Sequence, residues 1–198
     1  LAIRRYRVTF MCPGGHSWSH FGRPSAIHKM SRVVSRLDSL KMPREPKTTC
    51  NVGTISGGNS VNSIAESCTM EVDLRSLSAD ALKALEDDFL NIVEEGRGED
   101  VSVDVELVGD RPAARLSPDS EYVTAAVEAA EHFKFDVRLA ASSTDAAVPL
   151  SEGIPSVSFG IYHGEGGHTL KERVFLDSLV PGLKRLALTV LVLAGAQQ

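Results

Sequence analysis

The chain has 198 residues, of which 42% are hydrophobic and 24% charged, the balance of a globular protein with one large domain or two small ones. A formal net charge of -5 leaves no basic surplus for a phosphate backbone and argues against nucleic acid as a partner. The cysteines Cys12, Cys50 and Cys68 lack metal-type spacing. We therefore expect buried apolar thiols in a reducing, cytoplasmic compartment.

The two ends of the chain carry limited information. The most apolar stretch, 186–195, is about half the length of a membrane-spanning helix, so the sequence predicts no membrane span. Leu1 directly precedes a strand pattern without an initiator Met. We therefore expect the natural N-terminus to lie upstream.

Four strands are predicted in the first part of the chain, three because apolar and polar residues alternate and one, 48–58, because it is β-branched and ends in glycines. They cover residues 6–10, 48–58, 67–75 and 101–107.

Two apolar stripes with helical spacing lie between these strands. The first predicts a helix over 24–40 with Pro24 in its first turn, and the second predicts a helix capped by Ser78, with Asp80 complementing the helix dipole. The inward side chains are Ile27, Met30, Val34 and Leu37 in the first helix and Leu82, Leu85, Phe89 and Ile92 in the second. The resulting order, βαββαβ, is the split βαβ or ferredoxin-like arrangement.

Turn residues near Asp110 predict a domain boundary, with domains over 1–110 and 111–198. Beyond it the patterns predict an α/β piece with parallel strands. The expected elements are a helix over 118–133 started by Ser117, Pro118 and Asp119, a strand near Val137, a small helix after Asp145, a strand over 155–161, and a closing helix with Leu176, Leu179, Leu183, Leu186 and Val190 inward. Two strands make a thin sheet, so we expect this α/β piece to be incomplete.

Three segments are rich in glycine and polar residues where packing does not require them. They read "GGHSWSHFG" at 14–22, "GGNSVNSIAESCTMEVDLRS" at 57–76 and "SSTDAAVPLSEGIPSVSFGIYHGEGGHTLKE" at 142–172. In order and spacing, these segments resemble the aminoacylase, peptidase T, carboxypeptidase G and succinyl-diaminopimelate desuccinylase family of dinuclear zinc metallopeptidases. The resemblance covers nearly the whole chain and implies a lid (dimerisation) domain followed by the last part of a catalytic domain.

His168 matches a family ligand of one of the two catalytic zinc ions, and imidazole is a suitable zinc donor. The alternative is a loop histidine that caps the closing helix. The resemblance places Glu172 outside the metal's ligands, so we interpret it as an orienting or capping carboxylate.

His16 matches the lid histidine that, in the family, enters the partner subunit's active site and stabilises the developing oxyanion. The alternative is a turn histidine bonded to nearby backbone, and by spacing alone His20 is an equal candidate. His28 and His132 are interpreted as surface residues, and His163 is left open.

Asn62 and Arg75 match lid residues that hold the substrate's carboxylate or carbonyl. A solvated cross-strand partner of Glu71 or Asp73 is the alternative for Arg75. The backbone N–H groups of Gly166 and Gly167 could receive a substrate carboxylate, although glycine is equally expected in any tight turn. Ser143 and Asp145 read as a helix start.

The other family ligands and the general-base glutamate come from an N-terminal half that is not in the chain. The resemblance therefore implies a fragment of a homodimeric enzyme that hydrolyses a peptide or N-acyl amide bond with two zinc ions. We expect the fragment itself to be metal-free and inactive, since a catalytic zinc needs about three protein ligands. Two alternatives stay open: a non-catalytic dimerisation module, and a small-molecule-binding regulatory domain of the same shape. The exact substrate, the choice between peptidase and deacylase, and the native metal are not fixed by the sequence.

Overall fold

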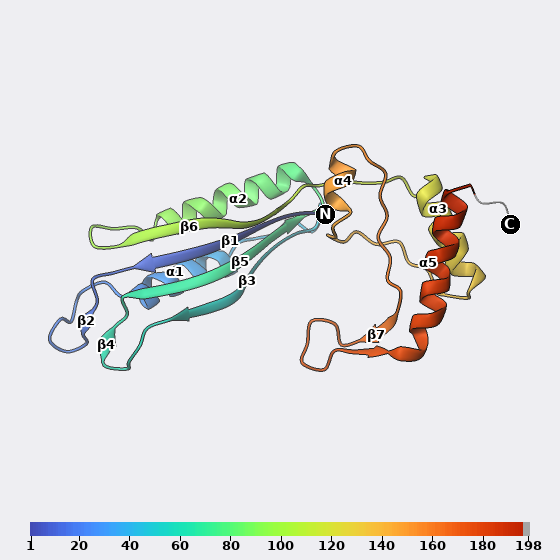
Figure 1. Ribbon diagram of the computed structural model, residues 1–198. Coiled ribbons are helices and arrows are strands. Elements are labelled where there is room, and N and C mark those ends of the chain that lie inside the picture. The colour runs from blue at the N-terminus through green and yellow to red at the C-terminus, as the bar shows by residue number, and fades with distance from the viewer. Residues whose placement is uncertain (196–198) are drawn as a thin grey trace. The chain divides into compact units, whose positions relative to one another are not determined.

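The computed structural model describes residues 1–195 (Figure 1). The chain forms two compact units, Leu1–Ala113 and Ala114–Gln198, which are called here the first and the second unit.

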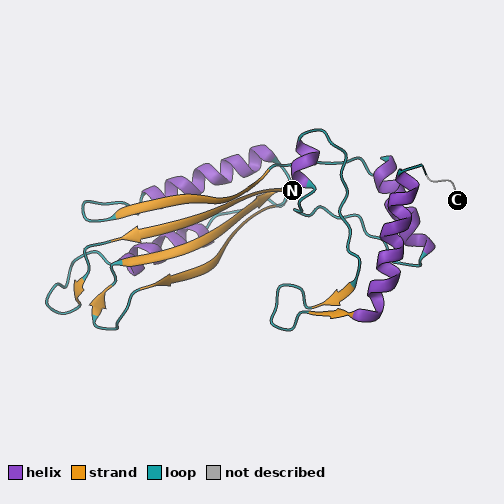
Figure 2. Cartoon of the chain, viewed as in Figure 1, coloured by secondary structure: helices purple, strands orange, loops and turns teal. Residues whose placement is uncertain are grey.

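The first unit is built on an antiparallel sheet with the strand order β3-β5-β1-β6. Its strands are β1 (Ala2–Met11), β3 (Thr48–Gly57), β5 (Ser67–Ser76) and β6 (Ser102–Arg111). Two helices, α1 (Ala26–Asp38) and α2 (Ala79–Glu94), lie on one face of this sheet (Figure 2). The predicted βαββαβ lid fold is confirmed.

The core of the first unit lies between this sheet and its helices. Alternate residues of β1 and β5 point toward the helices, and Phe10, Met70 and Leu74 are fully buried there against Met30 of α1 and Phe89 of α2. The predicted cap is also confirmed, because the Oγ of Ser78 accepts the N–H of Ala81 at 3.3 Å. All four inward residues predicted for α2 are buried. In α1, Met30 and Leu37 are buried as predicted, but Ile27 is exposed, and Val33 is buried where Val34 was expected.

The opposite face of the sheet carries charged side chains in paired rows. The Nε of Arg5 lies 2.8 Å from Oδ1 of Asp73, and the guanidinium of Arg7 contacts Glu71 at 3.0 Å and Glu106 at 2.9 Å. Neighbouring strands align opposite charges on this face, and no helix of the first unit covers it within the described residues.

The second unit contains helices, short loops and one small ladder. Its elements are α3 (Glu121–His132), α4 (Ala147–Ser151), β7 (His163–Glu165), β8 (Arg173–Phe175), the 3-10 turn η1 (Leu176–Ser178) and α5 (Leu179–Leu193). Strands β7 and β8 pair antiparallel, and α3 packs against α5.

Two strand predictions for the second unit are wrong. Neither the region near Val137 nor residues 155–161 forms a strand, and the described part of the unit contains no parallel pair. A strand persists only where a neighbour takes up its N–H and C=O groups, and the described residues offer none beside these segments.

The start of helix α3 differs from the prediction. Ser117 begins a turn and accepts the N–H of Ser120, and the Oγ of Ser120 then caps α3 by accepting the N–H of Val123 at 3.3 Å. Both serines are suitable N-cap residues, so the sequence does not choose between them. Helix α4 follows Asp145, as predicted, and begins at Ala147.

The inward face predicted for α5 is wrong. Leu176, Leu183 and Val190 are 76%, 52% and 55% exposed, whereas Gly182 and Thr189 are the buried residues of this helix. Because α5 is apolar on more than one side, periodicity alone does not tell which side packs against α3.

The three cysteines behave as small apolar residues, as predicted. Cys68 is buried, and Cys12 and Cys50 are half-buried against the core of the first unit as free thiols. Burial raises the pKa of Cys50 to about 11, which keeps this thiol protonated at neutral pH.

No helix within residues 1–195 combines the length and hydropathy that crossing a bilayer requires.

Candidate functional site

Two predicted site residues, His16 and Asn62, lie next to each other at one end of the first unit. The short strand β2 (Gly15–His16) pairs with β4 (Ser63–Ile64), and the N–H of Ser17 donates to the carbonyl of Asn62 at 2.9 Å. We call residues 13–22 and 57–65 the tip. Figure 1 shows β2 and β4 side by side at the end of the unit opposite the N-terminus.

The imidazole of His16 is exposed and has a defined tautomer. Its Nδ1 accepts the backbone N–H of Trp18 at 3.2 Å, so the neutral ring carries its proton on Nε2. The Nδ1 of His20 likewise accepts the N–H of His16 at 3.0 Å. In both rings the Nε2 N–H is therefore free to donate to another molecule. The predicted alternative, a turn histidine bonded to nearby backbone, is also present, because Nδ1 of His16 accepts a backbone N–H.

Two glycines make the backbone before His16 possible. Gly14 has φ +71° and Gly15 has φ +142°, a region that favours glycine. A Cβ on Gly15 would lie 2.8 Å from Nδ1 of His20, and one on Gly14 would collide with the side chain of Glu66. This close approach is the physical reason for the glycine pair in the motif.

Arg75 lies at the other end of β5 from Asn62. It pairs with Ile3 in the register of the sheet, and Ile3 also pairs with Arg111, where the chain leaves the first unit. From Ser67 to Arg75 the strand runs roughly 26 Å at about 3.3 Å per residue. One copy of the chain therefore does not bring Arg75 together with His16 and Asn62.

The guanidinium of Arg75 is held by the carboxylate of Asp73. Its Nε and Nη2 both donate to Asp73, the latter at 3.2 Å. Burial alone would raise the pKa of Asp73, but hydrogen bonds from Arg75 and Arg5 outweigh it, and the pKa lies below its ordinary value of 3.8. Asp73 takes two of the five N–H donors of the guanidinium. Arg75 therefore has Asp73 as its partner, as in the predicted alternative, but within the same strand and not across strands.

His168 lies in an exposed turn of the second unit. Its φ of +64° is left-handed, its backbone N–H donates to Oε2 of Glu172 at 3.1 Å, and Thr169 closes the turn by donating to the carbonyl of Gly166 at 2.7 Å. Glu172 thus fixes the backbone that carries the imidazole. The alternative of a cap for the closing helix is wrong, because β8 and η1 separate His168 from α5.

A complete metal centre does not form from residues 1–195 alone. Within this range no group of three or more His, Cys, Asp or Glu side chains is placed to hold a metal ion, whereas a catalytic zinc takes about three protein ligands. His168 offers one exposed imidazole. The described donor set therefore does not fit a catalytic zinc without ligands from elsewhere.

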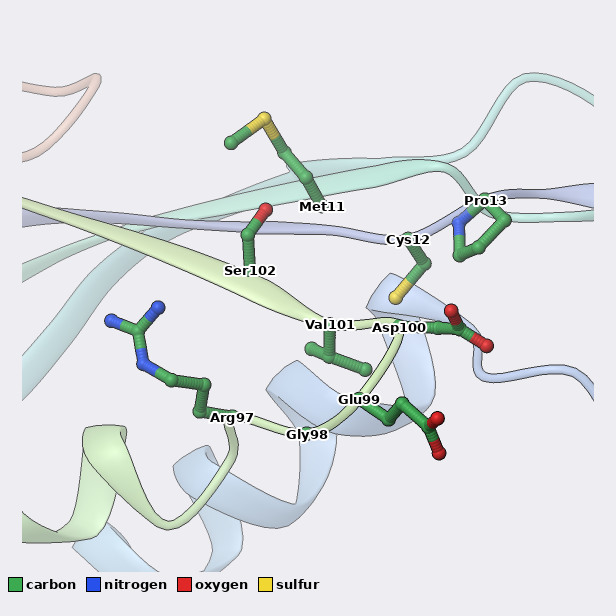
Figure 3. Close-up of a pocket in the computed structure, with 9 residues that line it drawn as sticks. All are labelled: Met11, Cys12, Pro13, Arg97, Gly98, Glu99, Asp100, Val101 and Ser102. Carbon is green, nitrogen blue, oxygen red and sulfur yellow. The ribbon is translucent and has the colours of Figure 1, made fainter.

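Two surface hollows lie away from most of the predicted residues. One of about 390 Å³ in the first unit is lined by Met11, Cys12, Pro13, Arg97, Gly98, Glu99, Asp100, Val101 and Ser102 (Figure 3). Another of about 450 Å³ in the second unit includes His163, which the sequence left open and whose ring stacks on Phe175 at 5.5 Å. His28 and His132 are exposed, as predicted.

The antiparallel βαββαβ unit with a paired tip defines a ferredoxin-like lid domain. Residues 5–101 match the family model of the peptidase dimerisation domain, so this part of the chain carries that domain. A comparison with curated protein sequences gives no match.

Similar solved structures share the fold at low sequence identity. A tripeptidase from Staphylococcus aureus has 23% identity and a TM-score of 0.69, and covers 98% of this chain and 52% of its own. An amidase of the hydantoinase/carbamoylase family from Burkholderia vietnamiensis has 20% identity and a TM-score of 0.72, and the match covers 96% of this chain and 47% of the amidase. Aminopeptidase PepT from Bacillus cereus has 20% identity and a TM-score of 0.67, and the match covers 98% of this chain and 52% of the aminopeptidase. The chain therefore spans about half the length of these proteins.

Proposed function

We propose that the protein containing this chain hydrolyses a peptide or N-acyl amide bond. The observation that carries this proposal is the pairing of exposed His16 with Ser63, which brings His16 beside Asn62 at the tip of a peptidase dimerisation domain. The similar structures include a tripeptidase, an aminopeptidase and an amidase, whose names share the cleavage of an amide bond.

His16 is proposed to stabilise the oxyanion that forms when water attacks the scissile carbonyl. The Trp18 N–H occupies Nδ1 and leaves the Nε2 proton free to point outward. A fixed donor aimed at developing negative charge contributes far more in a site without water than in solution. His20 has an equivalent nitrogen and is the alternative donor.

Arg75 and Asn62 are proposed to hold the carboxylate and the carbonyl of one substrate from two copies of the chain. The length of β5 keeps the two side chains far apart in a single copy. A site that uses both therefore takes Arg75 from one chain and the tip, with His16 and Asn62, from its partner. Asp73 orients the guanidinium and leaves its other N–H groups to the substrate.

Zinc is the proposed metal, with two ions in the intact enzyme and His168 as one ligand. The remaining ligands would come from polypeptide other than residues 1–195, since the described residues do not complete a site. Gly166 and Gly167 precede this histidine, and a Cβ on Gly167 would meet nothing within 4 Å. Their backbone N–H groups are proposed to receive a substrate carboxylate.

A homodimer through the lid domain follows from this arrangement. The helices and an edge strand, β3 or β6, are the proposed contacts, because edge strands carry unpaired backbone groups. The free cysteines support the cytoplasm as the proposed location.

The test is an assay of the whole protein with added zinc against a panel of dipeptides and N-acyl amino acids. We expect turnover, with kcat lowered about 100- to 1,000-fold in His16→Ala and unchanged in the exposed control His28→Ala. The His20→Ala variant tests the alternative donor. Absence of turnover on every substrate would contradict the proposed function and favour a dimerisation module.

A further inference from the structure

The tip has an unusual composition for an exposed surface. Residues 13–22 and 57–65 contain no Asp, Glu, Lys or Arg, although these residues make up 24% of the chain. Surfaces that stay in water are normally charged, whereas surfaces that lose water on binding are depleted of charge and enriched in aromatic residues. The tip therefore has the composition of a surface that is dehydrated when the protein works.

Large apolar side chains project from both loops of the tip. Trp18 is 86% exposed, Phe21 is 91% exposed, and Val61 is fully exposed. Ser17 and Asn62 are joined by a backbone hydrogen bond; Trp18 follows Ser17 and Val61 precedes Asn62. The N–H of Phe21 donates to the carbonyl of Trp18 at 3.4 Å, so the two aromatic residues share one turn.

Trp18 is also tied directly to the proposed oxyanion donor. Its backbone N–H occupies Nδ1 of His16, which fixes the imidazole and the start of the indole side chain in one turn. Whatever binds at the Nε2 of His16 therefore lies beside a large apolar surface. The two loops of the tip contain no charged residue of their own, and the flanking charges, Arg23 and Glu66, lie beside Gly14.

We propose that Trp18, with Phe21 and Val61, forms an apolar wall of the substrate site and selects amides with a large apolar side chain beside the scissile bond. This inference rests on the proposed function, which places the tip at the substrate. An indole or phenyl ring buries about 150–250 Å² on binding, so the wall contributes most of its binding free energy to bulky apolar substrates. Small or charged side chains gain little from it.

The experiment measures kcat/KM of the whole zinc-loaded protein for N-acyl amino acids and dipeptides that differ only in one side chain, from Ala through Val and Leu to Phe. Wild type is expected to prefer the larger side chains by about tenfold or more. Trp18→Ala should remove most of this preference, through a larger fall in kcat/KM on the Phe substrate than on the Ala substrate. Trp18→Phe should retain the preference.

Ser19→Ala is the matched control, because Ser19 lies in the same turn, is exposed, and should leave the preference unchanged. An equal loss on all substrates in Trp18→Ala, or a loss of dimers measured by analytical ultracentrifugation, would overturn the apolar wall and leave the proposed function standing. If wild type hydrolyses none of the substrates, the proposed function fails, and the apolar wall is then tested separately by measuring the affinities of the same compounds by calorimetry. Affinities that do not depend on side-chain size, or that Trp18→Ala does not change, would overturn the apolar wall.

Discussion

Gly15 controls the position of both tip histidines, so its replacement provides a sharp test of the tip. In Gly15→Ala the new Cβ meets Nδ1 of His20 at 2.8 Å at a φ of +142°. We expect a loss of about 1–3 kcal/mol in the free energy of unfolding, measured by urea unfolding, together with a shifted NMR resonance of the His16 ring.

Gly98→Ala is the control for that substitution. A Cβ there would make ordinary contacts of 3.8 Å or more, so unfolding should change by less than about 0.5 kcal/mol. Equal stability of the two variants would show that the backbone at Gly15 tolerates a side chain.

Asp73 links stability to pH on the charged face of the sheet. Its folded-state pKa lies below 3.8 because Arg75 and Arg5 bind the carboxylate. The stabilisation is therefore complete above about pH 4 and is lost as the pH falls through the lowered folded-state value. We expect Asp73→Asn to cost about 1 kcal/mol or less at pH 7 and to lose less stability than wild type between pH 5 and pH 2.

Urea unfolding at a series of pH values checks this expectation. Asp104→Asn, at an exposed position of β6, is the control and should follow the wild-type curve. Parallel curves for wild type and Asp73→Asn would contradict the linkage.

Helix α2 anchors the first unit through Phe89. The ring is fully buried and lies 5.1 Å from the ring of Tyr6 in β1. Phe89→Ala should lower the free energy of unfolding by about 3–5 kcal/mol, as measured by thermal and urea unfolding. Asp88→Ala, on the exposed side of the same helix, should change it by less than about 0.5 kcal/mol.

The elements of the first unit could be predicted from sequence because each has one solvent-facing side and one buried side. Strand β5 buries Cys68, Met70, Val72 and Leu74 and leaves the residues between them half-buried or exposed. Helix α2 buries Leu82, Leu85, Phe89 and Ile92 at helical spacing. When burial alternates in this way, the period of the sequence equals the period of the structure.

The second unit could not be predicted in the same way. Residues 155–161 are apolar enough for a buried strand, yet strand formation depends on a partner far away in the sequence, which no local pattern reveals. In α5 the apolar residues surround the helix, and the pattern gives no single inward face. The separation of Arg75 from Asn62, by contrast, follows from the predicted strand over 67–75, because each strand residue adds about 3.3 Å.

The isolated 198-residue chain provides a test of the proposed metal centre. We expect no hydrolysis of dipeptides or N-acyl amino acids at any zinc concentration, because a single imidazole does not replace about three ligands. The assay is run beside the whole protein on the same substrates. Turnover by the chain alone would contradict His168 as one member of a larger ligand set.

The length of β5, ten residues, predicts complementation between inactive variants. If the two ends of this strand contribute to the two different substrate sites of a dimer, an inactive His16→Ala chain and an inactive Arg75→Ala chain should restore activity when mixed. Each mixed dimer would contain one intact site, so random reassortment should restore about one quarter of wild-type activity. His16→Ala mixed with Asn62→Ala should restore none, because both defects lie at the tip and each site of the mixed dimer then has one of them. A defective chain would thus be complemented only by a partner whose defect lies at the opposite end of β5.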